Sequence, residues 1–131
     1  METRKGRMKI LIVDDDEQIR EILRMWFEKV GFEVFEAADG KKGVEVHRHS
    51  PVDMLICDLI MPGQEGIETI TQFKNEFPKV CIIAISGGGQ IGPDSYLPMA
   101  TSLGAWKVYK KPLGIAMMIE DIKAWQKENN I

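Results

Sequence analysis

Apolar residues follow two alternating patterns along the chain. Some runs are almost wholly apolar and rich in β-branched residues, as expected of strands buried on both faces of a parallel sheet; they cover 8–13, 54–57 and 80–85. Two weaker runs, 32–35 and 106–109, predict further strands, the first at a sheet edge. Between the strands, apolar residues recur every three or four positions, which predicts amphipathic helices over about 19–30, 40–49, 67–77, 95–103 and 115–126.

This order of elements predicts the fold class. Strict alternation of strand and helix is typical of an α/β protein with a doubly wound parallel sheet and right-handed crossovers. We expect five strands in the order 2-1-3-4-5, the flavodoxin-like arrangement, with five helices covering both faces. A single domain is expected over residues 8–128, with a basic tail at 1–7 and a short tail at 129–131.

Local signals support several of the predicted boundaries. Gly31 follows the first helical stripe, where a glycine commonly ends a helix. Asp39 is placed to cap the second helix, and Pro78 to end the third. The helix over 95–103 has the weakest support, because Pro93 and Pro98 interrupt its pattern.

Composition narrows the class of protein. The chain has 131 residues, enough for one domain with a real core, and its 44% hydrophobic and 28% charged residues are ordinary for a globular protein. No apolar run is long enough for a membrane span or resembles a signal peptide, so a cytoplasmic location is expected. The net charge of −3 gives no reason to expect nucleic acid binding. Cys57 and Cys81 fall within predicted strands and are interpreted as reduced core thiols.

Polar side chains follow four of the predicted strands. Asp14 and Asp15 come directly after the first strand and Asp58 after the third; Ser86 follows the fourth and Lys111 the fifth. Because the carboxyl ends of parallel strands meet at one edge of a sheet, we expect these side chains to converge. The candidate site therefore lies at this edge.

The carboxylates of this set predict a metal site. Asp14 and Asp15 would meet Asp58 across neighbouring strands, and such a cluster repels itself unless a cation is bound. Oxygen ligands of this kind suit Mg²⁺ or Mn²⁺. The simpler interpretation is that residues 14–16 cap the first helix, but a cap needs one acid and here there are three.

Ser86 and Lys111 complement these acids. A hydroxyl and a fixed ammonium beside a metal-bound carboxylate suit an attached phosphoryl group, whose oxygens the cation, the lysine and the hydroxyl can share. The glycines that follow Ser86 leave space beside it. The set therefore favours a site for phosphoryl transfer over the interpretation that these five residues are unrelated turn and surface residues.

Four separated motifs carry a resemblance to a known family. VDDDEQIR, ICDLIMPG, AISGGG and GAWKVYKKPL occur in the order and spacing found in the receiver domains of two-component response regulators, the CheY-like family. The likeness covers essentially the whole chain. It implies that Asp58 is the phosphoacceptor, that Asp15 binds Mg²⁺ directly and Asp14 through water, and that the backbone carbonyl of Ile60 is a further ligand.

The resemblance also implies roles for the remaining site residues. Ser86 would be the switch hydroxyl and Lys111 the phosphate-binding lysine, with a cis peptide bond before Pro112. The sequence departs from the family at Val108, three residues before the lysine, where the switch aromatic usually lies. Trp106 and Tyr109 are near this position but out of register, so the resemblance implies the Ser86 movement but does not assign the coupled ring movement to either residue.

The implied function is signalling rather than classical enzyme turnover. A histidine kinase or a histidine phosphotransfer protein would donate a phosphoryl group to Asp58 in an Mg²⁺-dependent reaction. Water would later hydrolyse the product. A stand-alone receiver is expected, whose output is contact with a protein target through the face formed by the last two helices and the last strand. Neither direct nucleic acid binding nor membrane association is expected.

The residues leave two other classes of protein open. The first is a metal-dependent phosphohydrolase of the haloacid dehalogenase type, because Asp14-x-Asp16 matches its nucleophile motif. That class does not explain Asp58, and its late Gly-Asp-x-x-x-Asp pair is not found in the sequence. The second is a dinucleotide-binding module suggested by the glycines at 87, 89 and 92, but such a motif belongs after the first strand.

Overall fold

The computed structural model describes residues 6–61, 65–87 and 97–131, which form five strands and five helices in strict alternation. The strands are β1 (Lys9–Val13), β2 (Glu33–Ala37), β3 (Met54–Asp58), β4 (Cys81–Ser86) and β5 (Lys107–Lys110). The helices are α1 (Glu17–Lys29), α2 (Gly40–His49), α3 (Glu65–Glu76), α4 (Leu97–Ser102) and α5 (Ile115–Glu128). None of the helices in the described part of the chain is long and apolar enough to cross a membrane.

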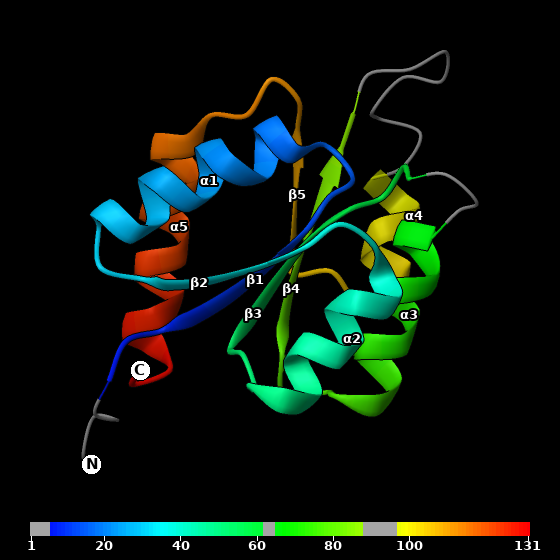
Figure 1. Ribbon diagram of the computed structural model, residues 1–131, viewed down its shortest axis with the longest axis horizontal. Coiled ribbons are helices and arrows are strands. Elements are labelled where there is room, and N and C mark those ends of the chain that lie inside the picture. Colours follow the sequence, from blue (N-terminus) through cyan, green and yellow to red (C-terminus); the bar gives the residue numbers. More distant parts are fainter. Residues whose placement is uncertain (1–5, 62–64, 88–96) are drawn as a thin grey trace.

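The strands form one parallel sheet in the order β2-β1-β3-β4-β5 (Figure 1). This order confirms the doubly wound arrangement expected from the sequence. β1 and β3 are neighbours, with Val13 opposite Cys57. The segments that follow these two strands therefore leave the sheet side by side, at the switch point where ligands bind in open α/β sheets.

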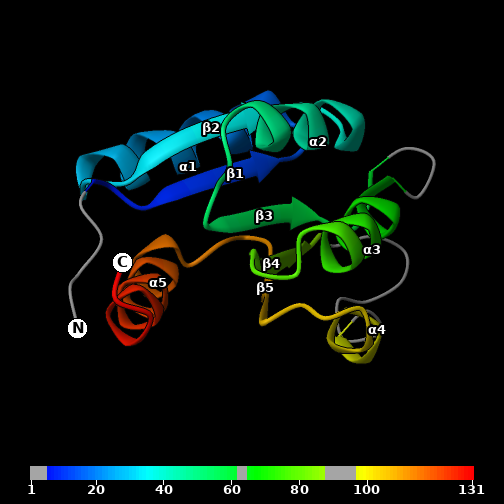
Figure 2. The same ribbon diagram turned by 90° about the horizontal axis from the view of Figure 1, so that it is seen from below.

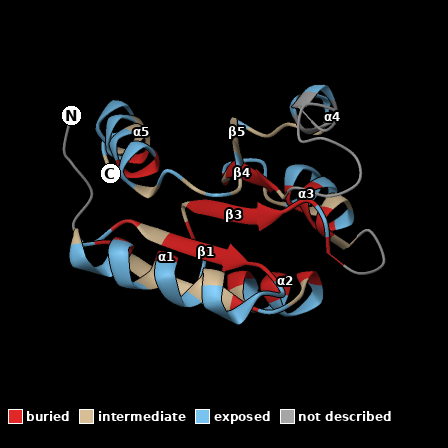
Figure 3. Cartoon of the chain, turned by 90° about the horizontal axis from the view of Figure 1, so that it is seen from above, coloured by how far each residue is buried: buried red, intermediate tan, exposed pale blue. Residues whose placement is uncertain are grey.

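Two hydrophobic cores lie on opposite faces of the sheet. Figure 1 and Figure 2 show α1 and α5 on one face and α2, α3 and α4 on the other. Alternate residues of each central strand enter the two cores: Ile10 and Ile12 of β1 face α1 and α5, whereas Leu11 and Val13 face α2 and α3. The inner strands are buried on both faces (Figure 3), which explains their continuous apolar runs.

Capping residues begin and end the helices where the sequence predicted. The Asp16 carboxylate accepts hydrogen bonds from the backbone N–H groups of Gln18 and Ile19, at the start of α1. Asp39 accepts from the backbone N–H of Lys42 at the start of α2. Gly31 follows the end of α1 with φ +100°, a left-handed conformation that favours glycine.

Several boundaries differ from the sequence prediction. β2 continues to Ala37 because every residue from Glu33 on pairs with β1, although its polar residues hide the strand pattern. β5 begins at Lys107. The first two residues of the helix expected over 95–103 lie outside the described part of the chain, and α4 covers Leu97–Ser102.

His47 is a buried polar residue in the core on the α2 and α3 side. Its ring is 7% exposed, packs 4.3 Å from the Phe77 ring between centroids, and accepts a hydrogen bond at Nδ1 from the backbone N–H of Val52 at 3.0 Å. Burial lowers the pKa of His47, so the neutral ring is favoured in the fold. It is therefore a structural acceptor on α2.

The lowered pKa of His47 predicts a loss of stability in acid. In the unfolded chain the ring binds a proton below about pH 6.5, whereas the folded ring resists protonation until a lower pH. Between these two values the unfolded state holds more protons, so the free energy of unfolding falls as the pH drops. Urea unfolding at pH 7.5 and pH 5.5 measures this effect. His47→Gln should flatten the pH dependence and His49→Gln should keep it; equal slopes in both variants would contradict the assignment.

Candidate functional site

The carboxyl edge of the sheet gathers the polar residues singled out in the sequence. β1 ends just before Asp14, β3 ends at Asp58 and β4 ends at Ser86. β5 ends one residue before Lys111. All these strands run parallel, and the arrowheads of β1 and β3 point the same way in Figure 3. The sequence-predicted residues therefore share one edge.

Three carboxylates meet at this edge. Asp14, Asp15 and Asp58 each offer an oxygen, and these oxygens lie within 4.8 Å of one another. Asp14 is fully buried and Asp58 is 3% exposed, whereas Asp15 is exposed to solvent. Two buried acids beside a solvent-facing one form a cluster of oxygen ligands that is open on one side, which suits a hard divalent cation.

Asp14 shows the electrostatic cost of this arrangement. Burial raises the pKa of Asp14; the hydrogen bond that its Oδ1 accepts from the backbone N–H of Asp16, at 2.9 Å, opposes this, and the nearby Asp58 carboxylate raises the pKa further. Its other oxygen, Oδ2, is buried and has no hydrogen-bond partner in the described part of the structure. Apart from its ion pair with Lys111 at 3.4 Å, this buried oxygen faces other acids, which fits a cation site.

Lys111 supplies the positive charge of the site. Its Nζ donates a hydrogen bond to Asp58 Oδ2 at 3.1 Å and lies 3.4 Å from Asp14 Oδ2. Burial alone would lower the pKa of Lys111, but the Asp58 and Asp14 carboxylates raise it overall, so the ammonium stays charged. The peptide bond between Lys111 and Pro112 is cis, as the resemblance to receiver domains implied.

Ser86 lies at the same edge, between the strands that carry Asp58 and Lys111. It is the residue after Ile85, the β4 partner of Asp58, and its carbonyl accepts a hydrogen bond from the backbone N–H of Lys111 at 3.0 Å. Its side chain is fully buried, and within the described residues Oγ has no hydrogen-bond partner. A buried hydroxyl free to rotate can donate to a ligand at this edge.

The loop after Asp58 is held close to its carboxylate. The backbone N–H of Ile60 donates to Asp58 Oδ1 at 3.0 Å, while the Ile60 side chain is 42% exposed. The role expected for the Ile60 carbonyl stays a prediction. Cys57 faces the opposite side of β3 from Asp58, packs in the core beside α3 and has a pKa raised well above its usual value by burial. A redox function is therefore not assigned to this thiol.

Two residues that the sequence did not single out contact the main chain of the site. Gly66, near the start of α3, packs so closely that a Cβ there would lie 1.9 Å from the carbonyl oxygen of Asp58. Arg20, in the first turns of α1, donates from Nη1 to the carbonyl of Asp14 at 2.7 Å. The sequence signal for Gly66 was a glycine near the start of a predicted helix. The signal for Arg20 was a cation near the amino end of a helix, where the helix dipole disfavours positive charge.

The departure at Val108 is reflected in the packing of β5. Val108, at the sequence position where the family usually has its switch aromatic, packs against the core on the α2 and α3 side. Tyr109 faces the other side and donates from its hydroxyl to Asp121 Oδ2 of α5 at 2.5 Å. Tyr109 is thus tied to α5 and does not take the position of Val108. Most of the glycine motif at 87, 89 and 92 lies outside the described residues.

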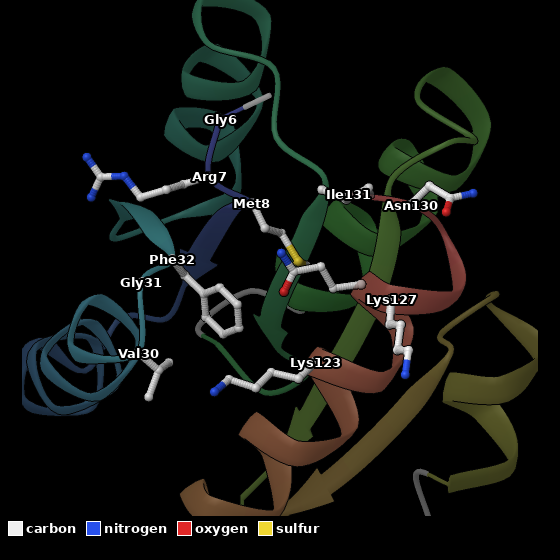
Figure 4. A pocket seen from close by; sticks show the side chains of 11 residues that line it. Gly6, Arg7, Met8, Val30, Gly31, Phe32, Lys123, Lys127, Asn130 and Ile131 are labelled. Carbon is white, nitrogen blue, oxygen red and sulfur yellow. The ribbon is translucent and has the colours of Figure 1, made fainter. Parts of the chain in front are cut away.

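A hollow of about 560 Å³ lies at the other end of the sheet (Figure 4). It is bounded by the residues leading into β1 and β2, including Met8 and Phe32, and by the last turns of α5, including Lys123 and Lys127. These are the amino ends of the strands. The hollow is therefore separate from the acidic cluster at the carboxyl ends.

Comparison with known proteins identifies the family. The family model for the response regulator receiver domain matches residues 10–123, which include all the residues of the acidic cluster together with Ser86 and Lys111. The chain belongs to the response regulator receiver domains. This family serves signalling rather than classical enzyme turnover, and its assignment gives no support to the haloacid dehalogenase alternative.

Curated relatives of this receiver domain include proteins of different lengths. It is 32% identical over 115 residues to the response regulator GtcR of Aneurinibacillus migulanus, a match that covers 88% of this chain and 46% of that protein. It is 29% identical over 117 residues to sporulation initiation phosphotransferase F of Bacillus subtilis, with 89% and 92% covered. The chain therefore spans less than half of one relative and most of the other.

Solved structures of other receivers share the fold. The CheY-like receiver domain protein of Methanospirillum hungatei superposes with a TM-score of 0.82 and 25% sequence identity, covering 94% of this chain and 96% of that one. The receiver domain of the Francisella response regulator 1452 gives a TM-score of 0.82 at 22% identity, covering 94% and 99%. The fold class predicted from the sequence is thus confirmed.

Proposed function

We propose that this receiver domain accepts a phosphoryl group on Asp58 from a phosphohistidine of a sensor kinase or phosphotransfer protein, in a reaction that requires Mg²⁺ or Mn²⁺. The observation that carries the proposal is the position of Asp58. Its carboxylate lies among the oxygens of Asp14 and Asp15 and 3.1 Å from the Lys111 ammonium. This surrounding combines a nucleophile with the charges that phosphoryl transfer needs.

The donor set fits a divalent cation. The carboxylates of Asp14, Asp15 and Asp58 would hold it, with the Ile60 carbonyl as a further expected ligand. When bound, the cation would neutralise charge on the transferring phosphoryl oxygens. Asp14 is fully buried beside Asp58, and Lys111 at 3.4 Å is one positive charge shared by both carboxylates, so a cation would offset the remaining repulsion among the acids.

The chain's own residues then have distinct tasks. A carboxylate oxygen of Asp58 attacks phosphorus while the bond from phosphorus to the donor's imidazole nitrogen breaks, and the electron pair returns to that nitrogen. Lys111 offers an ammonium to the phosphoryl oxygens, and the rotatable Ser86 hydroxyl offers a hydrogen bond. Water later hydrolyses the acyl phosphate, returning the Asp58 carboxylate and inorganic phosphate.

Output is proposed to pass through the face formed by α4, β5 and α5. Lys111 follows β5 directly, so a change in its contacts at Asp58 acts on the end of this strand. Tyr109 of β5 is bonded to Asp121 of α5. A protein target on this face would sense the phosphorylated state through these linked elements.

Phosphorylation by a small donor tests the proposed function. Incubation with acetyl phosphate and Mg²⁺ should add one phosphoryl group to the protein, seen as a mass increase of about 80 Da by intact mass spectrometry, because the three carboxylates and Lys111 supply the full site. Chelation of divalent ions should slow the reaction by at least about a hundredfold. An adduct that forms equally fast after chelation would contradict the metal requirement.

A further inference from the structure

Arg20 occupies an unfavourable position for a cation. It lies in the first turns of α1, where the helix dipole places partial positive charge and favours acids. Its side chain nevertheless folds toward the helix start and is only 15% exposed. A local rule broken in this way beside a functional site indicates that the residue serves the site.

Two contacts fix the guanidinium of Arg20. Nη1 donates to the main-chain carbonyl of Asp14 at 2.7 Å, and Nε donates to Glu36 Oε1 of β2 at 3.2 Å. Arg24 also donates to Glu36, from one helical turn further along α1. The Glu36 carboxylate thus offsets the helix dipole and orients Arg20, since a guanidinium is planar and binds in a fixed direction.

The hydrogen bond from Arg20 to Asp14 fixes part of the main chain that carries the acidic cluster. The backbone N–H of Asp14 donates to the carbonyl of Ala37 in β2 at 3.3 Å, and its carbonyl accepts from Arg20. Both main-chain polar groups of Asp14 are therefore held from outside β1. The carbonyl that Arg20 binds belongs to the peptide joining Asp14 to Asp15, so its orientation sets the direction of the turn that carries both acids.

We infer that Arg20, oriented by Glu36, is a positioning residue for the divalent cation site. It holds the Asp14–Asp15 peptide so that both carboxylates face Asp58, and it does so without touching the cation. This inference rests on the proposed function, because it assumes that the acidic cluster binds a cation. Outer contacts that orient metal ligands commonly change metal affinity tenfold or more when they are removed.

Arg24 provides a matched control for Arg20. Both arginines lie on α1 and bind the same carboxylate of Glu36, but only Arg20 reaches the Asp14 carbonyl. Loss of either side chain removes an ion pair and some packing. Only the loss of Arg20 removes the hydrogen bond to the Asp14 carbonyl, which holds the turn carrying Asp14 and Asp15.

Direct measurement of Mn²⁺ binding to the unphosphorylated protein, by electron paramagnetic resonance of the free ion, tests this inference. Arg20→Ala should raise the dissociation constant about tenfold, whereas Arg24→Ala should change it less than about twofold. Glu36→Gln should fall between them, because Arg20 keeps its bond to Asp14 but loses its orientation. Arg20→Lys should restore part of the affinity through a single donor.

Phosphorylation by acetyl phosphate at varied Mg²⁺ distinguishes an effect of Arg20 on cation binding from an effect on the phosphoryl-transfer step. Arg20→Ala should need about tenfold more Mg²⁺ for half-maximal rate, with a maximal rate within about threefold of wild type. Equal Mn²⁺ affinity of Arg20→Ala and Arg24→Ala would overturn the inference. If Arg20→Ala does not fold, Arg20→Lys and Glu36→Gln decide the question by the same comparison. Failure of the wild type to bind Mn²⁺ would instead overturn the proposed function.

Discussion

Asp58→Asn should abolish phosphoryl transfer to this receiver domain. The substitution keeps the size of the side chain but replaces the nucleophilic carboxylate by an amide, which cannot form the acyl phosphate. Intact mass spectrometry after incubation with acetyl phosphate and Mg²⁺ should show complete conversion of the wild type and no adduct on the variant. We expect a loss of more than about a thousandfold in rate, because Asp14, the other described carboxylate that pairs with Lys111, is fully buried and lies further from the ammonium, at 3.4 Å against 3.1 Å for Asp58.

Asp14→Asn is the matched comparison for Asp58→Asn. It removes a carboxylate from the same cluster but leaves the nucleophile, so slow phosphorylation should persist at high Mg²⁺. The opposite result, with transfer lost in Asp14→Asn and retained in Asp58→Asn, would favour chemistry of the haloacid dehalogenase type. Asn at either position also removes a charge from the cluster, so both variants should fold.

Gly66→Ala should destabilise the domain and slow phosphorylation together. The added Cβ would lie 1.9 Å from the Asp58 carbonyl oxygen and 2.7 Å from that of Leu59. Both atoms belong to the main chain that carries the acceptor, so α3 must retreat or this loop must move. We expect a loss of about 2–3 kcal/mol in the free energy of unfolding, measured in urea, since overpacking of a close contact has costs of this order.

Gly114→Ala separates this close contact from general effects of replacing glycine. Gly114 precedes α5, and a Cβ at this position meets no atom within 4 Å. The change should cost less than about 1 kcal/mol and leave the phosphorylation rate unchanged. Equal losses of stability in the two variants would show that the contact of Gly66 with the acceptor loop does not limit the packing of α3.

The strand and helix order could be predicted because each element carries its own periodic signal. β1, β3 and β4 are buried on both faces and have continuous apolar runs, so their ends located the site edge. β2 was predicted too short because Glu36 ends its apolar run, although this residue still pairs with β1 and binds Arg20 and Arg24 of α1.

The supporting contacts of the site could not be predicted in the same way. Arg20 reaches Asp14 and Glu36 only after α1 and β2 have packed side by side, and nothing in its sequence neighbours indicates this pairing. Gly66 touches the Asp58 carbonyl through the packing of α3 on β3. The sequence indicates which residues end the strands, whereas the contacts behind them depend on the tertiary structure.

Locating the phosphoryl group on the chain tests the central claim most directly. After reaction with acetyl phosphate and Mg²⁺, reduction with borohydride converts a phosphorylated aspartate to homoserine, which peptide mass spectrometry can assign to a position. The account predicts homoserine at position 58 and at none of positions 14, 15 and 16. Homoserine at one of those three positions, with residue 58 unchanged, would contradict it.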